Sequence, residues 1–202
     1  MYGVNPAHSL RCRCGTFQGY VARSTSAVRA VCYCKDCQAF ARFLGTQGIT
    51  DPDGGTEVVA TLPRHVRLTA GLEALSCLSL SERGLLRWYA SCCNTPVGNT
   101  PRNRKLPYVG LVHNCLEGGA SSIASTFGTR RVAVNTQSAR NDVQSTPVAS
   151  TVAVVGLMAS AIVDRLGGAY RDNPFFAADT GAPIRSVRVL SSAERERAYR
   201  DA

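Results

Sequence analysis

The segment CYCKDC, residues 32–37, places three cysteines within six positions of the 202-residue chain. A C-x-x-C turn can hold two thiolates on one metal ion, and the C-x-C pair before it adds a third ligand from the same turn. Zinc takes four tetrahedral ligands, and three protein ligands leave one position for water or a substrate. We therefore expect Cys32, Cys34 and Cys37 to bind Zn²⁺ at a catalytic type of site. Buried free thiols or ligands of an iron–sulfur cluster are the alternatives.

Two further cysteine pairs flank this triplet at a distance. Cys12 and Cys14 form a C-x-C-G, and Cys92 and Cys93 are adjacent. Pairs from distant segments suit a closed structural zinc site. The chain has nine cysteines, an odd number, and its first residues show no basic stretch followed by an apolar run. These features favour metal binding in a reducing compartment over disulfides, and they predict a cytoplasmic protein.

The order of these motifs carries a family resemblance. The C-x-C-G, the C-x-C-x-x-C and the later segment YASCCNTP, residues 89–96, resemble the glutathione-dependent formaldehyde-activating enzyme family, which includes the domain of centromere protein V. The resemblance spans about residues 10–98 and implies a zinc-bearing β-tent fold. It also implies one structural zinc on the first and last cysteine pairs, and one zinc on the triplet that takes the thiol of glutathione or its adduct.

One position departs from the pattern of that family. Its last motif is usually C-x-x-C-G-T-P, whereas here Ala90 stands at the first cysteine position and Cys93 at the second. We consider Cys92 as the substitute ligand, with Cys77 or Cys115 as alternatives, so the chain is expected to bind one or two zinc ions. Asn94 replaces the glycine of the family and tolerates a positive φ.

The predicted elements divide the chain into two parts. Residues 1–115 hold every cysteine. This part shows one helical segment, at 36–44, and strand-like segments at 16–21, 27–32, 56–61, 65–68 and 85–89. Residues 116–202 show weak strand patterns at 123–127 and 131–134, and a charged helix that starts at Ser191 or Ser192. We predict a mainly β fold of α+β class. It consists of a zinc-binding domain, 1–115, and a C-terminal extension, 116–202, that packs on it and contains one or two helices.

The longest apolar stretch runs from about Pro147 to Val163. It is short for a membrane span, and Thr146 followed by Pro147 is typical of a helix start, with Gly167 at its end. Its larger apolar residues recur at three- to four-residue steps, opposite a face of small residues. We expect an amphipathic helix, with no membrane association, whose larger residues face the core: Val148, Val152, Val155, Ile162 and Leu166.

The formal net charge of +9 favours anionic small ligands. The basic residues are dispersed and aromatics make up only 7%, which disfavours nucleic acid as a partner. His65 and His113 lack a partner motif and are interpreted as ordinary residues. Arg87 is interpreted as a strand-packing residue, with contact to a substrate carboxylate as the alternative.

These observations and the resemblance lead to two functional hypotheses. The first is a zinc-dependent carbon–sulfur lyase acting on glutathione or a related thiol adduct, with Cys32, Cys34 and Cys37 as the catalytic metal ligands. The second is a non-catalytic, zinc-stabilised binding module. Residues 116–202 would either cover the triplet site or form a contact in a homodimer.

Overall fold

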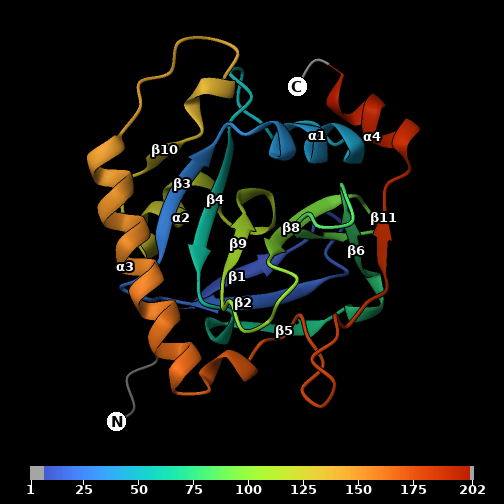
Figure 1. Cartoon of the computed structure of the whole chain (residues 1–202), viewed down its shortest axis with the longest axis vertical. Helices are drawn as coiled ribbons and strands as arrows, with labels where there is room; N and C mark the ends of the chain where they lie inside the picture. The colour runs from blue at the N-terminus through green and yellow to red at the C-terminus, as the bar shows by residue number, and fades with distance from the viewer. Residues whose placement is uncertain (1–6, 201–202) are drawn as a thin grey trace.

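The computed structural model describes residues 7–200, which form a mainly β fold of α+β class with two sheets and four α-helices (Figure 1). The smaller sheet has the antiparallel order β1-β2-β5, with β1 at Ala7–Arg11, β2 at Gln18–Ala22 and β5 at Val66–Ala70. The larger sheet has the order β10-β3-β4-β9-β8-β7-β6-β11. Its strands are β3 Val28–Cys32, β4 Thr56–Thr61, β6 Leu75–Ser79, β7 Leu86–Ala90, β8 Thr95–Thr100, β9 Val109–Val112, β10 Val132–Val134 and β11 Val187–Val189.

One apolar core joins the two sheets. Leu10 of β1 and Val21 of β2 are buried together with Trp88 of β7 and Leu111 of β9. The indole Nε1–H of Trp88 donates a hydrogen bond to Thr100 Oγ1 at 3.0 Å, so the one polar atom of this ring is satisfied in the core. Phe175, far along the chain, lies 5.1 Å from the indole, centroid to centroid. Residues 116–202 therefore share the main core with residues 1–115.

Residues 116–202 also extend the larger sheet at both edges. β10 pairs in parallel with β3, and β11 pairs in parallel with β6. α4, Ser192–Tyr199, begins at a capping box formed by Ser191 and Glu194, and it packs along α1, Lys35–Leu44. Both edges of the sheet are thus made by short strands from the C-terminal part of the chain.

The predicted strand at 123–127 is wrong, because this segment lies in α2, Gly119–Phe127. Ile123 and Phe127 stand four positions apart, which places them on one face of a helix. Ile123 is fully buried, and the ring of Phe127 lies 5.6 Å from that of His8. The burial of residues at helical spacing therefore favours a helix over a strand in this segment.

α3, Pro147–Leu166, has the predicted position, but the predicted orientation of its faces is wrong. It packs against β3 and β10, and the packed residues are Ala149, Ala153, Leu157 and Ala161. The five larger residues expected in the core are all exposed, from 55% for Ile162 to 83% for Leu166. Small side chains let the helix approach the sheet closely, and Asp164 on the same face is buried in an ion pair with Arg64 at 2.7 Å.

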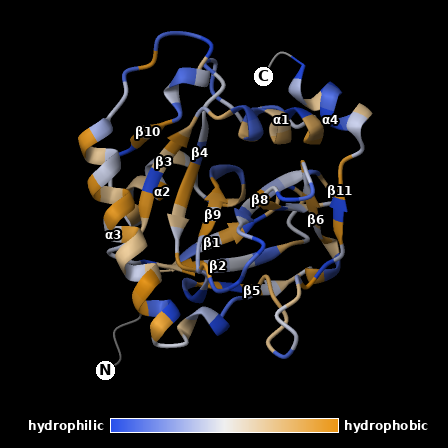
Figure 2. Cartoon of the chain, in the orientation of Figure 1, coloured by the Kyte–Doolittle hydropathy of each residue, from blue (hydrophilic) through white to orange (hydrophobic). Residues whose placement is uncertain are grey.

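The outward face of α3 is consequently apolar, as Figure 2 shows along the length of the helix. By length and composition alone, α3 is the one helix among residues 7–200 that could cross a membrane, with a mean hydropathy of 1.7. Core helices of other proteins pass the same test. Here the helix lies against the larger sheet.

The orientation of α3 predicts effects of different size for two neighbouring substitutions. Ala153→Asp places a carboxylate against the sheet and is expected to lower the free energy of unfolding by about 2 kcal/mol. Val152→Asp changes an exposed position, 69% accessible, and is expected to cost less than about 0.5 kcal/mol. Urea unfolding of the two zinc-loaded variants measures both, and a larger loss for Val152→Asp would show that the opposite face packs.

Candidate metal centres

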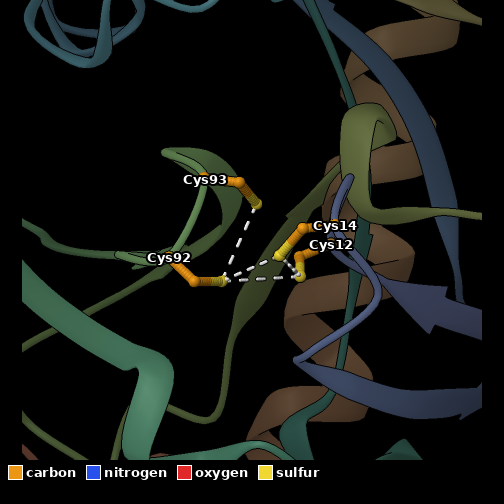
Figure 3. Close-up of side chains that lie close together, drawn as sticks. All are labelled: Cys12, Cys14, Cys92 and Cys93. Atoms are coloured by element: carbon orange, nitrogen blue, oxygen red, sulfur yellow. Dashed lines mark hydrogen bonds between the residues drawn. The ribbon is translucent and has the colours of Figure 1, made fainter.

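The first cysteine group contains Cys12, Cys14, Cys92 and Cys93, whose sulfur atoms all lie within 4.8 Å of one another (Figure 3). The Sγ–Sγ distances are 3.5 Å for Cys12–Cys14, 3.2 Å for Cys14–Cys92, and 3.8 Å for Cys12–Cys92 and for Cys92–Cys93. Zn–S bonds of 2.3 Å in tetrahedral geometry require sulfur atoms about 3.8 Å apart. The four thiols therefore fit a closed zinc site with little movement.

The first pair of this group lies in a turn after β1. The Gly15 N–H donates to the carbonyl of Cys12 at 2.8 Å, and Gly15 has a φ of +80°. This positive φ favours glycine, because other residues adopt it only with strain. The Phe17 N–H donates to the Cys12 sulfur at 3.2 Å, which holds this side chain in the turn.

The adjacent cysteines Cys92 and Cys93 lie in the turn between β7 and β8. Asn94 follows them with a φ of 52°, the positive value expected where the resembling family has glycine. The Arg13 N–H donates to Thr95 Oγ1 at 3.0 Å, which ties this turn to the first one. Ala90 is fully buried in β7, and Cys92 is the cysteine that lies in the four-cysteine group together with Cys93.

The structure keeps the two alternative ligands, Cys77 and Cys115, outside both groups. Both are buried, and burial raises the pKa of each thiol to about 12. The Cys115 thiol also lies 3.2 Å from the carbonyl of Val97 and 3.1 Å from that of Val112. These two cysteines are neutral core residues, and all nine cysteines are free of disulfides.

The second group contains Cys32, Cys34 and Cys37, also within 4.8 Å of one another. Cys32 ends β3, and Cys34 is the N-cap of α1, where its sulfur accepts the Cys37 N–H at 3.4 Å. The positive end of the helix dipole stabilises thiolates at this place. Among residues 7–200 the group has these three members, one fewer than the four ligands that zinc takes.

Two polar side chains support the triplet from other strands. Asn135, which follows β10, donates to the Cys32 sulfur at 3.4 Å, and Arg87 of β7 lies 3.9 Å from the Cys37 sulfur. Arg87 is 3% exposed and pairs with Asp36 at 3.6 Å, while Asp36 accepts the Tyr199 hydroxyl at 2.5 Å. Arg87 therefore does more than pack, because its positive charge lies beside the thiols of the triplet.

The three thiols of the triplet affect one another's ionisation. Hydrogen bonds from Cys32 and Cys34, with the nearby Arg87, hold the pKa of Cys37 well below its ordinary value. Hydrogen bonds with Cys32 and Cys37, together with burial, raise the pKa of Cys34 far above its ordinary value. Three crowded sulfurs thus ionise together only when a metal ion offsets their charge. The residues present fit a zinc ion.

The triplet opens into a cleft of about 480 Å³ between α3 and the larger sheet. Its lining is mostly apolar and comes from β3, β4, β10, α3 and the loop before β9. The lining residues are Val28, Ala30, Cys32, Cys34, Asp36, Cys37, Val58, Ala60, Leu85, Arg87, Asn99, Pro107, Tyr108, Val132, Val134, Asn135, Val154, Leu157, Met158 and Ala161. Burial raises the pKa of Tyr108, so its hydroxyl is neutral. His65 and His113 belong to neither metal group.

Sequence reasoning missed Asn135 and the role of α3 in this cleft. Asn135 has a φ of 57°, and asparagine is one of the few residues that adopt this conformation readily. Nothing in the sequence around Asn135 indicates the parallel pairing of β10 with β3, which brings this side chain to Cys32. The sequence pattern did not indicate how α3 packs, because the larger apolar residues of this helix face outward.

Comparison with known proteins gives a family match. The profile of a family described as a family of unknown function, DUF6151, matches residues 4–182. A search of curated proteins found no match. A solved Rhodobacter sphaeroides protein from structural genomics is similar over 55% of this chain and 90% of its own, with 20% identity and a TM-score of 0.38, too low to support any argument. Since the family profile covers most of the sequence, the chain belongs to the DUF6151 family.

Proposed function

We propose that this protein is a zinc-dependent carbon–sulfur lyase that acts on the adduct of a thiol with a small aldehyde. The observation that carries the proposal is the group of Cys32, Cys34 and Cys37, which supplies three ligands and borders a cleft of about 480 Å³. An incomplete ligand set beside a cleft is typical of catalytic zinc. The resemblance of the cysteine motifs to the glutathione-dependent formaldehyde-activating enzymes supports the same chemistry.

The residues of the chain prepare this centre for a sulfur ligand. Cys32, Cys34 and Cys37 would hold the zinc ion, whose Lewis acidity would lower the pKa of a substrate thiol. Asn135 and Arg87 contact the Cys32 and Cys37 sulfurs and so fix the orientation of two ligands. Asp36, paired with Arg87 and hydrogen-bonded to Tyr199, holds the guanidinium in place.

The proposed reaction is the cleavage of a hemithioacetal. The hydroxyl group of the adduct loses its proton as its C–O bond becomes a carbonyl. The C–S bond breaks, its electron pair stays on sulfur, and the thiol is released after it regains one proton. The products are an aldehyde and the free thiol, so the reaction needs no oxidant, and the reverse reaction forms the adduct.

The four-cysteine site has a different proposed role. It joins the turn after β1 to the turn between β7 and β8, about eighty residues apart, and its four sulfurs leave no open position on a tetrahedral ion. Metal binding at such a site adds directly to the folding free energy. We propose zinc here as a structural ion. Both centres require a reducing compartment, and we propose that the protein lies in the cytoplasm.

The Cys34→Ala variant tests the proposed activity. It is expected to lower the zinc content from two ions per chain to one and to reduce turnover of hydroxymethyl-thiol adducts, such as that of glutathione, at least 100-fold. The thermal midpoint should fall less than in a variant of the four-cysteine site, because that site is intact and the protein still folds. Metal analysis, aldehyde release and thermal unfolding measure these effects. Full zinc loading with no thiol binding in the wild type would instead favour a zinc-stabilised binding module.

The Cys92→Ser variant tests the structural site. It removes one ligand of the closed centre, so we expect zinc to fall by one ion per chain and the thermal midpoint to fall by about 10 °C or more. The Cys77→Ala variant is the matched control, since it removes a buried cysteine outside both groups and should keep both ions. Equal zinc content in the two variants would show that Cys92 is not a ligand.

A further inference from the structure

We infer that the thiol bound at the triplet carries an apolar tail, alkyl or aryl, which lies in the cleft between α3 and the larger sheet. Apolar thiols and their aldehyde adducts, rather than glutathione, are then the preferred substrate class. The inference rests on the proposed function in one respect, that the triplet centre binds a thiol group.

The shape of the cleft supports a tail that extends away from the cysteines. The triplet lies at the junction of β3 and α1, and the cleft continues along Ala30, Val58 and Val132, which form a buried apolar cluster of the sheet. Leu157 and Ala161 of α3 close the opposite side. The volume of about 480 Å³ lies within the range of small-molecule sites.

The charges of the cleft argue against glutathione. Its described lining residues include two charged side chains, Asp36 and Arg87, and these pair with each other at 3.6 Å. The Arg87 side chain is 3% exposed and also contacts Cys37, so its positive charge already has partners within the protein. Glutathione brings two carboxylates and an ammonium group, and the described lining offers no further charged side chain to pair with them. Burying such charges without partners is costly.

The mouth of the cleft gives a second, independent observation. Val154 and Met158 line it, yet they are 45% and 58% exposed. A ligand tail in the cleft would cover these side chains and remove apolar surface from water, which is favourable. Met158 is also unbranched and flexible, and such side chains adapt to apolar ligands of different shape. An apolar tail therefore complements both the buried wall and the mouth.

Chain-length dependence tests the inference. Straight-chain thiols of two, four, six and eight carbons, and glutathione, are titrated into the cobalt-substituted protein while thiolate-to-cobalt absorption is followed, with calorimetry as a second readout. Each added methylene is expected to lower the Kd about three- to fourfold until the cleft is filled. Glutathione is expected to bind more weakly than hexanethiol. A Kd independent of chain length, or tightest binding of glutathione, would overturn the inference.

Two variants of α3 locate the tail. Met158→Glu places a carboxylate at the mouth, and Val155→Glu places one on the outward face at a position of equal exposure, 58%. Met158→Glu is expected to weaken octanethiol at least tenfold and to leave ethanethiol unchanged, whereas Val155→Glu should change neither. Equal effects of both variants would place the tail elsewhere and overturn the inference.

The same titrations separate this inference from the proposed function. One outcome is that calorimetry shows binding that depends on chain length and is weakened by Met158→Glu, while the cobalt spectrum never changes. In that case the binding of an apolar tail in the cleft is supported, and the binding of a thiol at the metal is contradicted. If ethanethiol changes the spectrum and longer thiols bind no better, the proposed function stands and the apolar tail fails. If no thiol binds by either readout, both fail.

Discussion

The repulsion between crowded thiolates is the constraint on which this structure depends. Seven cysteines gather in two groups whose sulfurs lie within 4.8 Å of one another, and such groups ionise together only around a cation. One group links turns about eighty residues apart, and the other links the end of β3 to the start of α1. The metal ions would thus hold in place the turns that shape both the fold and the candidate site.

The C-terminal part of the chain completes the triplet site rather than merely covering it. The parallel pairing of β10 with β3 continues into Asn135, whose side chain contacts the Cys32 sulfur. The buried Gln38 of α1 donates to the carbonyls of Tyr33 and Ser138, which joins the cysteine turn to the segment after β10. α3 then forms one wall of the cleft. A division of the chain at residue 115 therefore separates the triplet from Asn135, one of the two side chains that contact its sulfurs.

The sequence predicted the features that depend on residues close together in the chain, such as helix starts and cysteine motifs. The apolar content of the segment at 56–61 indicates a strand, Pro147 and Ser191 mark the starts of α3 and α4, and the cysteine motifs predict two groups of thiols. The orientation of α3 could not be predicted, because its burial depends on close approach to β10 and on the Asp164–Arg64 pair, both distant in sequence. Asn135 was missed for the same reason, since a parallel pairing leaves no trace in a three-residue strand.

The balance of charge at the triplet connects the ion pair of Arg87 with the choice of ligand. Three thiolates exceed the charge of one Zn²⁺ by one, and the positive charge of Arg87 is offset by Asp36 at 3.6 Å. The loaded centre would therefore remain negative inside an apolar cleft, where charges are poorly screened. Such a centre repels carboxylates and favours neutral ligands with a soft donor atom. The ion pair thus stabilises the ligand Cys37 without leaving a free cation that would attract an anionic substrate.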